Sequence, residues 1–294
     1  MPWLINAAQF DKFRKNQKNI IVLDASWYMP HEERNAKDEF HQRHIVGAKF
    51  LDLREFADPA TDLPNMLLRD ENEISQKLGA LGMTNDFKIL LYDRSPYHTS
   101  CRAVWMFKVF GHNPLQLYVL DGGLDAWEKY GGKIEEGEPR ASSSKKYDVN
   151  YQAQYVRTLV QMKTNLHHPS EQVIDMRHPV RYAGGPEHRK GLRSGHIPGS
   201  YCFPYFSFFE PDGRWKPLEK IRKQLTGLGL DFHYPMVSTC GSGMTAAVLD
   251  FTLDILNHSN HAIYDGSWCE WGAEHLYHGE ESLAERPVIT SLDK

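Results

Sequence analysis

The length and composition of the chain limit the classes of protein to which it can belong. Its 294 residues are enough for two domains of ordinary size, and 41% hydrophobic and 24% charged residues are typical of a globular protein. The net charge of -4 gives no signal for a nucleic-acid or membrane-surface partner, and no apolar run approaches the roughly 20 residues that span a bilayer. Residues 1–18 lack the apolar core of a secretory signal, so we expect a cytoplasmic protein and leave mitochondrial import open.

The cysteines and histidines do not form a metal-binding pattern. The four cysteines are Cys101, Cys202, Cys240 and Cys269, with no CxxC pair among them, and the fifteen histidines are dispersed. This spacing is wrong for a structural zinc site and too sparse for a disulfide framework, so it favours a reducing compartment. We expect neither a metal nor an organic cofactor.

Taken in chain order, four signatures of the first half recur in the second half. Each half has a strand that ends in an acid, a His-Ile turn, a second buried strand, and a strand that leads through Asp-Gly to a tryptophan. These signatures occupy residues 20–25, 44–48, 88–93 and 118–127, and then 172–177, 196–200, 235–239 and 262–271. The two copies of each signature are separated by about 144 to 152 residues, so we infer a duplicated domain.

The alternation of strands and helices predicts the architecture of each half. Helical patterns follow the third signature, at 103–110 and at 246–256. Short apolar strands that alternate with helices are typical of an α/β fold in which a mostly parallel sheet is flanked by helices. We predict an N-terminal domain over 1–135, a linker over 136–151 and a C-terminal domain over 152–294. Ligands of such folds bind outside the carboxyl ends of the strands.

One loop carries the strongest chemical signal in the sequence. It reads Cys240-Gly241-Ser242-Gly243-Met244-Thr245. It lies between a predicted strand and a predicted helix, where unpaired N–H groups and the positive end of the helix dipole converge. Gly241 and Gly243 allow the backbone to curl into an anion nest, which Met244 and Thr245 complete. Such a nest favours the thiolate of Cys240 and suits a persulfide.

Two other interpretations fit this loop less well. An isolated cysteine in a tight turn is most often a small buried hydrophobe, but a glycine-rich loop between strand and helix favours a reactive thiol. A phosphatase of the Cys-x5-Arg type needs an arginine six residues after the nucleophile, and that position is Ala246. The loop therefore predicts a nucleophilic Cys240, with Ser242 as a hydrogen-bond donor to the thiolate or the substrate.

Over nearly its whole length, the chain resembles the tandem rhodanese-domain sulfurtransferases. The stretches that carry this resemblance, besides the loop, are 23–28, 102–107, 120–124, 195–199 and 264–268. The Cys240 loop is most similar to that of the 3-mercaptopyruvate sulfurtransferases. Thiosulfate-specific rhodaneses carry Arg and Lys just after the cysteine, where this chain has Gly241 and Ser242.

The resemblance implies two tandem rhodanese-like domains and a ping-pong reaction in the second. Cys240 would take sulfur from 3-mercaptopyruvate, pyruvate would leave, and a persulfide would remain on the enzyme. A thiol acceptor, such as thioredoxin or a low-molecular-weight thiol, would then remove this sulfur, sometimes with release of hydrogen sulfide. The first domain would be a non-catalytic scaffold, because its loop at 94–102 lacks the glycines of an anion nest.

Two arginines are the candidate substrate-binding residues. Mercaptopyruvate carries a carboxylate beside a ketone, so its site needs guanidinium groups. On local composition alone, the segment 181–189 would be a solvated basic loop. It resembles the family segment in which two arginines bind substrate, which points to Arg181 and Arg189. Arg177 and Arg193 are candidates for surface or supporting positions.

The chain departs from the family pattern in its first half. Members of the 3-mercaptopyruvate type usually contribute an Asp and a His that are proposed to act with the loop serine as a triad. The matching positions here are Arg54 and Asn65, and neither can do that work. Three interpretations remain open: the triad is dispensable, Arg54 shifts the preference to thiosulfate or another small donor, or the chain is a weakly active persulfide carrier or regulatory protein.

Overall fold

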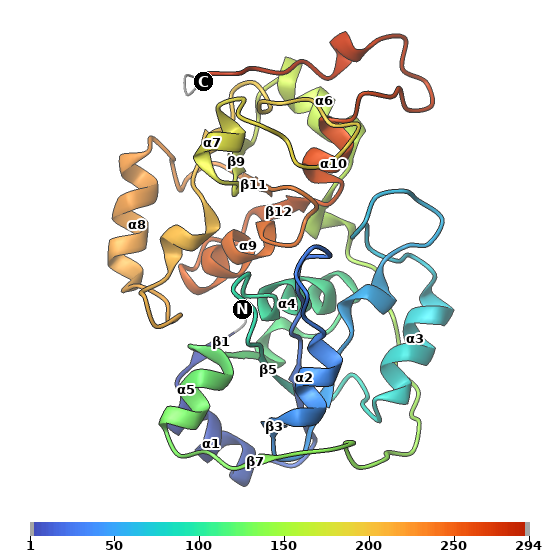
Figure 1. The fold of residues 1–294 in the computed structure, drawn as a ribbon, viewed down its shortest axis with the longest axis vertical. Helices are drawn as coiled ribbons and strands as arrows, with labels where there is room; N and C mark the ends of the chain where they lie inside the picture. Colours follow the sequence, from blue (N-terminus) through green and yellow to red (C-terminus); the bar gives the residue numbers. More distant parts are fainter. Residues whose placement is uncertain (1–2, 292–294) are drawn as a thin grey trace. The chain divides into compact units, whose positions relative to one another are not determined.

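The computed structural model describes residues 3–291, which form two compact units (Figure 1). The first unit contains the chain up to Ala57, Leu68–Gln152 and Phe209–Lys216. The second contains Asp58–Leu67, Ala153–Phe208 and the residues from Pro217 onward. Two short segments, 58–67 and 209–216, therefore belong to a different unit from their neighbours in sequence.

The first unit is built on a five-stranded sheet in which all neighbouring strands are parallel. Its strands are β1 (Trp3–Ile5), β2 (Ile20–Asp24), β4 (Ala48–Phe50), β5 (Lys88–Tyr92) and β6 (Leu117–Leu120), in the order β1-β6-β5-β2-β4. A separate antiparallel pair joins β3 (His44–Ile45) to β7 (Ile134–Glu135).

Helices cover the sheet of the first unit. They are α1 (Ala7–Asn16), α2 (Ala36–Gln42), α3 (Glu71–Ala80), α4 (Ser100–Val109) and α5 (Gly123–Lys129), with 3-10 turns η1 (Leu53–Phe56) and η2 (Pro114–Gln116). Side chains close the helix starts: Asn6 and Gln9 form a capping box before α1, and Asp70 caps α3. Phe10 of α1 and Trp127 of α5 pack in one core cluster with Leu90 of β5.

The second unit repeats this plan. Its strands are β8 (Val156–Arg157), β9 (Gln172–Asp175), β10 (Tyr201–Cys202), β11 (Met236–Thr239) and β12 (His261–Tyr264), all parallel, in the order β10-β9-β11-β12-β8. Its helices are α6 (Leu159–His167), α7 (Pro179–Tyr182), α8 (Leu218–Gly227), α9 (Ala246–Ile255) and α10 (Ser267–Trp271), with turns η3 (Ala153–Tyr155), η4 (Tyr205–Phe208) and η5 (Leu283–Glu285).

Helices lie on both sides of this second sheet. Val237 of β11 packs in a core cluster with Met162 of α6 and Trp271 of α10. The helix α9 contacts β11 and β12 and lies on the other side of the sheet in Figure 1. No helix among residues 3–291 is long and apolar enough to cross a membrane.

The strand orders confirm the α/β fold and the duplication. Read from β1 and from β8, the two sheets have the same order of corresponding strands. The strand register shows which residues of the two sheets correspond. Asp24 pairs with Tyr92 in the first sheet, as Asp175 pairs with Thr239 in the second. The first residue after each central strand, β5 or β11, takes the equivalent position in the two units. That residue is Asp93 in the first unit and Cys240 in the second.

Candidate active site

The reactive loop connects the central strand β11 to the helix α9. Cys240 follows the last residue of β11, and α9 begins at Ala246. Gly243 has φ = +78°, a left-handed conformation that favours glycine and turns the chain toward the helix start. Cys240 and Ser242 are buried, with 2% and 4% of each residue exposed. The loop therefore sets a buried thiol at the positive end of a ten-residue helix.

The start of α10 holds the head of the loop by its backbone. The N–H of Cys240 donates to the hydroxyl of Ser267 at 3.2 Å. In the other direction, Trp268 N–H donates to the Cys240 carbonyl at 3.0 Å, and Cys269 N–H donates to the Gly241 carbonyl at 2.9 Å. Ser267 has φ = +52°, an uncommon conformation for a residue other than glycine. These three bonds fix where the Cys240 side chain begins.

Both predicted substrate arginines lie against Gly241. A Cβ atom built on Gly241 would be 3.5 Å from Nη1 of Arg189 and 3.7 Å from Nη1 of Arg181. The Arg189 guanidinium also donates to Sγ of Cys269 at 2.6 Å and to Oγ of Ser242 at 3.4 Å. Two cationic side chains thus face the residue that follows Cys240, as a site for a small anion requires.

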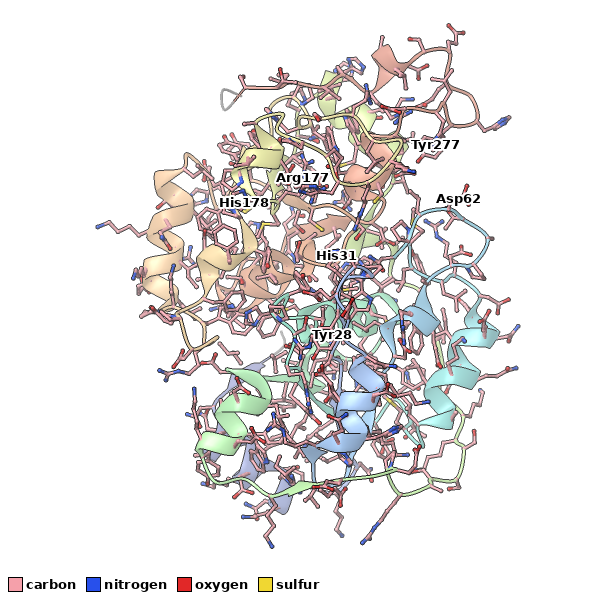
Figure 2. All side chains as sticks on the ribbon, in the orientation of Figure 1. Tyr28, His31, Asp62, Arg177, His178 and Tyr277 are labelled. Atoms are coloured by element: carbon pink, nitrogen blue, oxygen red, sulfur yellow. The ribbon has the colours of Figure 1, made fainter. Side chains whose placement is uncertain are left out.

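A buried carboxylate orients Arg181. Glu187, whose side chain is 5% exposed, accepts two hydrogen bonds at Oε2 from Arg181, at 2.7 and 3.2 Å. Arg177 lies inside the second unit (Figure 2), where it pairs with Asp175 at 2.7 Å and stacks over Trp268. Arg177 therefore occupies a supporting position below the loop. With Arg189, the three guanidiniums outnumber the two carboxylates, so the cluster keeps a net positive charge.

Asn65 makes a contact with the loop that the sequence did not predict. It lies on the segment 58–67, which belongs to the second unit. Its Nδ2 donates a hydrogen bond of 2.7 Å to Oγ of Ser242. The other departure from the family pattern, Arg54, lies in the first unit and forms a two-pronged pair with Asp52, with hydrogen bonds of 2.9 and 2.7 Å. Asn65 thus bonds to the loop serine although it cannot accept a proton from it.

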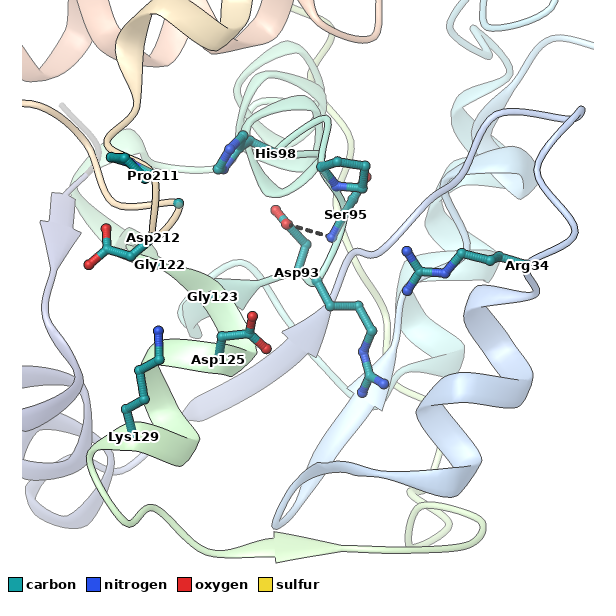
Figure 3. Close-up of a pocket in the computed structure, with 13 residues that line it drawn as sticks. Arg34, Asp93, Ser95, His98, Gly122, Gly123, Asp125, Lys129, Pro211 and Asp212 are labelled. Carbon is teal, nitrogen blue, oxygen red and sulfur yellow. Dashed lines mark hydrogen bonds between the residues drawn. The ribbon is translucent and has the colours of Figure 1, made fainter.

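The corresponding position of the first unit holds a carboxylate instead of a thiol. Asp93 accepts a hydrogen bond from the N–H group of Ser95 at 3.1 Å (Figure 3) and another from that of Ser100, the first residue of α4, at 2.7 Å. Burial raises the pKa of Asp93 to about 6. The Asp93 carboxylate therefore accepts hydrogen bonds from the backbone N–H groups that would otherwise be available to an external anion. The pocket beside Asp93 is also lined by Arg34 and Lys129.

The three remaining cysteines differ in their surroundings. Cys101 lies in the first turn of α4 and is fully buried. Burial raises the pKa of Cys202, on β10, to about 12. Burial also raises the pKa of the Cys269 thiol, whereas the Arg189 guanidinium beside it lowers that pKa in part. Of these three cysteines, Cys269 has its thiol at the loop, where the Arg189 guanidinium contacts it.

Other neighbours of the loop went unnoticed in the sequence although they lie in recognised stretches. Ser267 lies in the 264–268 stretch, and Cys269 follows it directly. Glu187 lies between Arg181 and Arg189, the two candidate substrate-binding residues. Ser267 and Glu187 are polar side chains within these stretches, and Cys269 is one residue beyond the first of them.

Comparisons with known proteins identify the domain family of both halves of the chain. The model of the rhodanese-like domain matches residues 6–130 and 158–274. The thiosulfate/3-mercaptopyruvate sulfurtransferase 1 of Arabidopsis thaliana, named as mitochondrial, is 36% identical over 279 residues, which cover 88% of this chain and 73% of the relative. The human 3-mercaptopyruvate sulfurtransferase is 34% identical over 255 residues, which cover 86% of this chain and 84% of the relative.

A solved structure supports the same assignment. The crystal structure of SseA from Escherichia coli, described among the 3-mercaptopyruvate sulfotransferases, aligns with a TM-score of 0.81 at 28% identity. The alignment covers 91% of this chain and 99% of that one. The chain therefore belongs to the rhodanese-like family, as a tandem-domain sulfurtransferase similar to the 3-mercaptopyruvate sulfurtransferases.

Proposed function

We propose that the chain transfers sulfur from 3-mercaptopyruvate to a thiol acceptor through a persulfide on Cys240, with release of pyruvate. The observation that carries this proposal is the position of Cys240. It lies at the carboxyl end of the central strand and before the N-terminus of α9, with Arg181 and Arg189 facing the next residue. A helix N-terminus stabilises a thiolate, and guanidinium groups bind the carboxylate of a small keto acid.

In the first half-reaction, the Cys240 thiolate attacks the sulfur of mercaptopyruvate. A sulfur–sulfur bond forms, the carbon–sulfur bond breaks, and its electron pair passes to the carbon as the enolate of pyruvate. The enolate oxygen gains charge in this step and needs a hydrogen-bond donor. Ser242 is suited to that role, because Asn65 donates to its oxygen and leaves its own hydrogen for another acceptor. The proton of the substrate thiol passes to this carbon and gives pyruvate, and the persulfide remains on Cys240 as an anion.

In the second half-reaction, an acceptor thiolate attacks the outer sulfur of the Cys240 persulfide. The bond between the two sulfurs breaks, and Cys240 regains its thiolate. The net positive charge of the Arg177, Arg181 and Arg189 cluster stabilises an anionic persulfide. Thioredoxin and low-molecular-weight thiols are the acceptors that we propose, in the cytoplasm or in mitochondria.

Thiosulfate is the second candidate donor. A thiosulfate dianion can use the same two guanidiniums, and one plant relative is named for both donors. The two donors differ in what Ser242 can do, because thiosulfate has no ketone to polarise. A loss of Ser242 should therefore weaken turnover of mercaptopyruvate more than turnover of thiosulfate.

The test is the initial rate of pyruvate release from 3-mercaptopyruvate, with thiosulfate assayed in parallel. The wild type is compared with Cys240→Ser and with Cys202→Ser, a matched control on β10. We expect turnover of mercaptopyruvate that only Cys240→Ser abolishes. Turnover of thiosulfate alone would make thiosulfate the donor. No turnover of either donor, by folded protein with a fresh thiol acceptor, would refute the proposal.

A further inference from the structure

A second thiol lies at the reactive loop. Cys269 is the third residue of α10, and its N–H donates to the carbonyl of Gly241, the residue after Cys240. The preceding residue, Trp268, donates in the same way to the carbonyl of Cys240. Two consecutive backbone hydrogen bonds therefore align residues 240–241 with residues 268–269. This alignment places Cys269 directly beside the loop residue that follows Cys240.

Arg189 connects Cys269 to the groups that handle the donor. Its Nη1 donates to Sγ of Cys269 at 2.6 Å, and its Nη2 donates to Oγ of Ser242 at 3.4 Å. The same Nη1 would be 3.5 Å from a Cβ atom on Gly241. One guanidinium thus spans the loop from Ser242 to Cys269. A substrate-binding cation in contact with a buried thiol is more than a packing residue requires, since a methyl group would fill the same space.

We propose that Cys269 is a second sulfur-carrying thiol, which accepts the outer sulfur of the Cys240 persulfide within the enzyme. This inference rests on the proposed function, because Cys240 must be loaded first. The Cys269 sulfur attacks the outer sulfur, the bond between the two sulfurs on Cys240 breaks, and its electron pair stays on Cys240. The proton of the Cys269 thiol passes to the Cys240 thiolate. The products are a Cys240 thiol and a Cys269 persulfide, and no oxidant or reductant is needed.

The position of Arg189 gives this transfer a direction. Burial disfavours a thiolate on Cys269 before the transfer. A persulfide is a stronger acid than a thiol, so its anion forms more readily on Cys269 and gains the charge-assisted contact with Arg189. While mercaptopyruvate is bound, its carboxylate competes for this guanidinium. The departure of pyruvate then frees Arg189 for the sulfur that Cys269 receives.

The first readout is stoichiometry. The wild type is mixed with a small excess of 3-mercaptopyruvate and no added acceptor, and the fast phase of pyruvate release is separated from the slower phase in which the thiol of the donor itself removes sulfur. Because Cys240 can be loaded again after the transfer, we expect a burst of about two pyruvates per chain in the wild type and about one in Cys269→Ser. Cys269→Ala provides a second variant in case serine disturbs folding, and Cys202→Ser, the matched control thiol, should keep the wild-type burst. A burst of the same size with and without Cys269 would overturn the proposal.

The second readout locates the sulfur. After alkylation of the loaded protein, digestion at aromatic residues separates Cys240 from Cys269, because Phe251 and Tyr264 lie between them. We expect a persulfide on both cysteines in the wild type and on neither in Cys240→Ser. Arg189→Lys should lower the share on Cys269, since an ammonium cannot make the same two contacts.

The outcomes separate this inference from the proposed function. A persulfide on Cys240 but never on Cys269 would refute the transfer to Cys269 and leave the sulfurtransferase reaction intact. A disulfide between the two cysteines, with release of sulfide, would mean attack on the inner sulfur and would also overturn it. Loading of Cys269 in Cys240→Ser would show direct loading instead of transfer. If Cys240 itself is never loaded, by mercaptopyruvate or by thiosulfate, the proposed function fails first.

Discussion

Asn65 donates a hydrogen bond of 2.7 Å to the hydroxyl of Ser242. Members of the 3-mercaptopyruvate type usually have a histidine at the place of Asn65, and a histidine can take the serine proton. An amide donor has the opposite effect, because it occupies a lone pair of the hydroxyl and leaves the hydrogen in place. In this chain, Ser242 is therefore set to donate a hydrogen bond and not to lose its proton.

This relationship predicts the effect of substitutions at Asn65. Asn65→Ala removes the donor, and we expect kcat/KM for mercaptopyruvate to fall about fivefold, since one such hydrogen bond contributes about 1 kcal/mol. Asn65→Asp should lower kcat/KM further, because a carboxylate cannot donate this hydrogen bond and its negative charge would repel the anionic mercaptopyruvate. Thr61→Ala, on the same segment, is the control; its hydroxyl accepts from Leu63 N–H. Steady-state kinetics that show no loss in Asn65→Ala would refute the role of this contact.

The two glycines of the loop should respond differently to alanine. Gly243 has φ = +78°, so Gly243→Ala adds strain of about 1 to 2 kcal/mol and should lower the melting temperature by a few degrees. Gly241 is not in this left-handed region, and a Cβ atom there would contact the guanidiniums of Arg189 and Arg181 at 3.5 to 3.8 Å.

Gly241→Ala should therefore raise KM for an anionic donor with little change in the melting temperature. Thermal unfolding and donor kinetics on both variants separate the two effects. The same fall in melting temperature for both would contradict the distinction, as would an unchanged KM in Gly241→Ala.

The arginines should also differ in their contribution. Arg189 reaches Ser242 and Cys269, whereas Arg181 is already held by the carboxylate of Glu187. We expect Arg189→Gln to lower kcat/KM for mercaptopyruvate about 10- to 100-fold, the range of a charge-assisted hydrogen bond of about 1.5 to 3 kcal/mol. Arg181→Gln should cost less, because its cation is partly neutralised.

Arg193→Gln is the matched control for these two variants. Arg193 donates to the carbonyls of Trp271 and Gly272, so it supports the backbone of α10 and its end. Its substitution should affect thermal stability before it affects donor binding. Equal losses of kcat/KM for all three arginines would show that the effects come from general charge and not from the geometry at Gly241.

Much of the fold could be predicted from the sequence because the signals are local. The acid-ended strands, the His-Ile turns and the Asp-Gly turns repeat in order, and the structure gives both sheets the corresponding strand order. The loop at Cys240 was predictable for the same reason, since strand, glycine-rich turn and helix are contiguous. The resemblance of 181–189 to a family segment indicates Arg181 and Arg189 as candidates, and the structure brings both guanidiniums to Gly241.

The contacts with the loop could not be predicted, because they join distant parts of the chain. Asn65 precedes Ser242 by 177 residues, and Arg189 precedes Cys269 by 80. Local patterning carries no information about such pairs. The family pattern at Asn65 concerns proton acceptance, and it gives no information about the hydrogen bond that the amide donates. Only the fold shows that the segment 58–67 belongs with the second unit.

The carboxylate of Asp93 predicts a pH dependence of stability. Its pKa in the folded protein is about 6, above the ordinary value of 3.8, because burial disfavours the charge. Between these two values, the folded protein binds the proton more readily than the unfolded chain. Asp93 therefore favours the folded state as the pH falls through 6 toward 3.8, and this contribution is lost as the pH rises back through 6.

Asp93→Asn removes this titration. From about pH 4.5 to about pH 7, the wild type loses the Asp93 contribution and the variant does not. We therefore expect the melting temperature of the wild type to fall relative to that of the variant as the pH rises. An asparagine also keeps only one acceptor oxygen for the N–H groups of Ser95 and Ser100, so the variant should be less stable at pH 4.5. Comparing the two proteins at each pH cancels the titration of the other buried acids. An identical pH dependence in both would show that Asp93 ionises alike in the folded and unfolded chain.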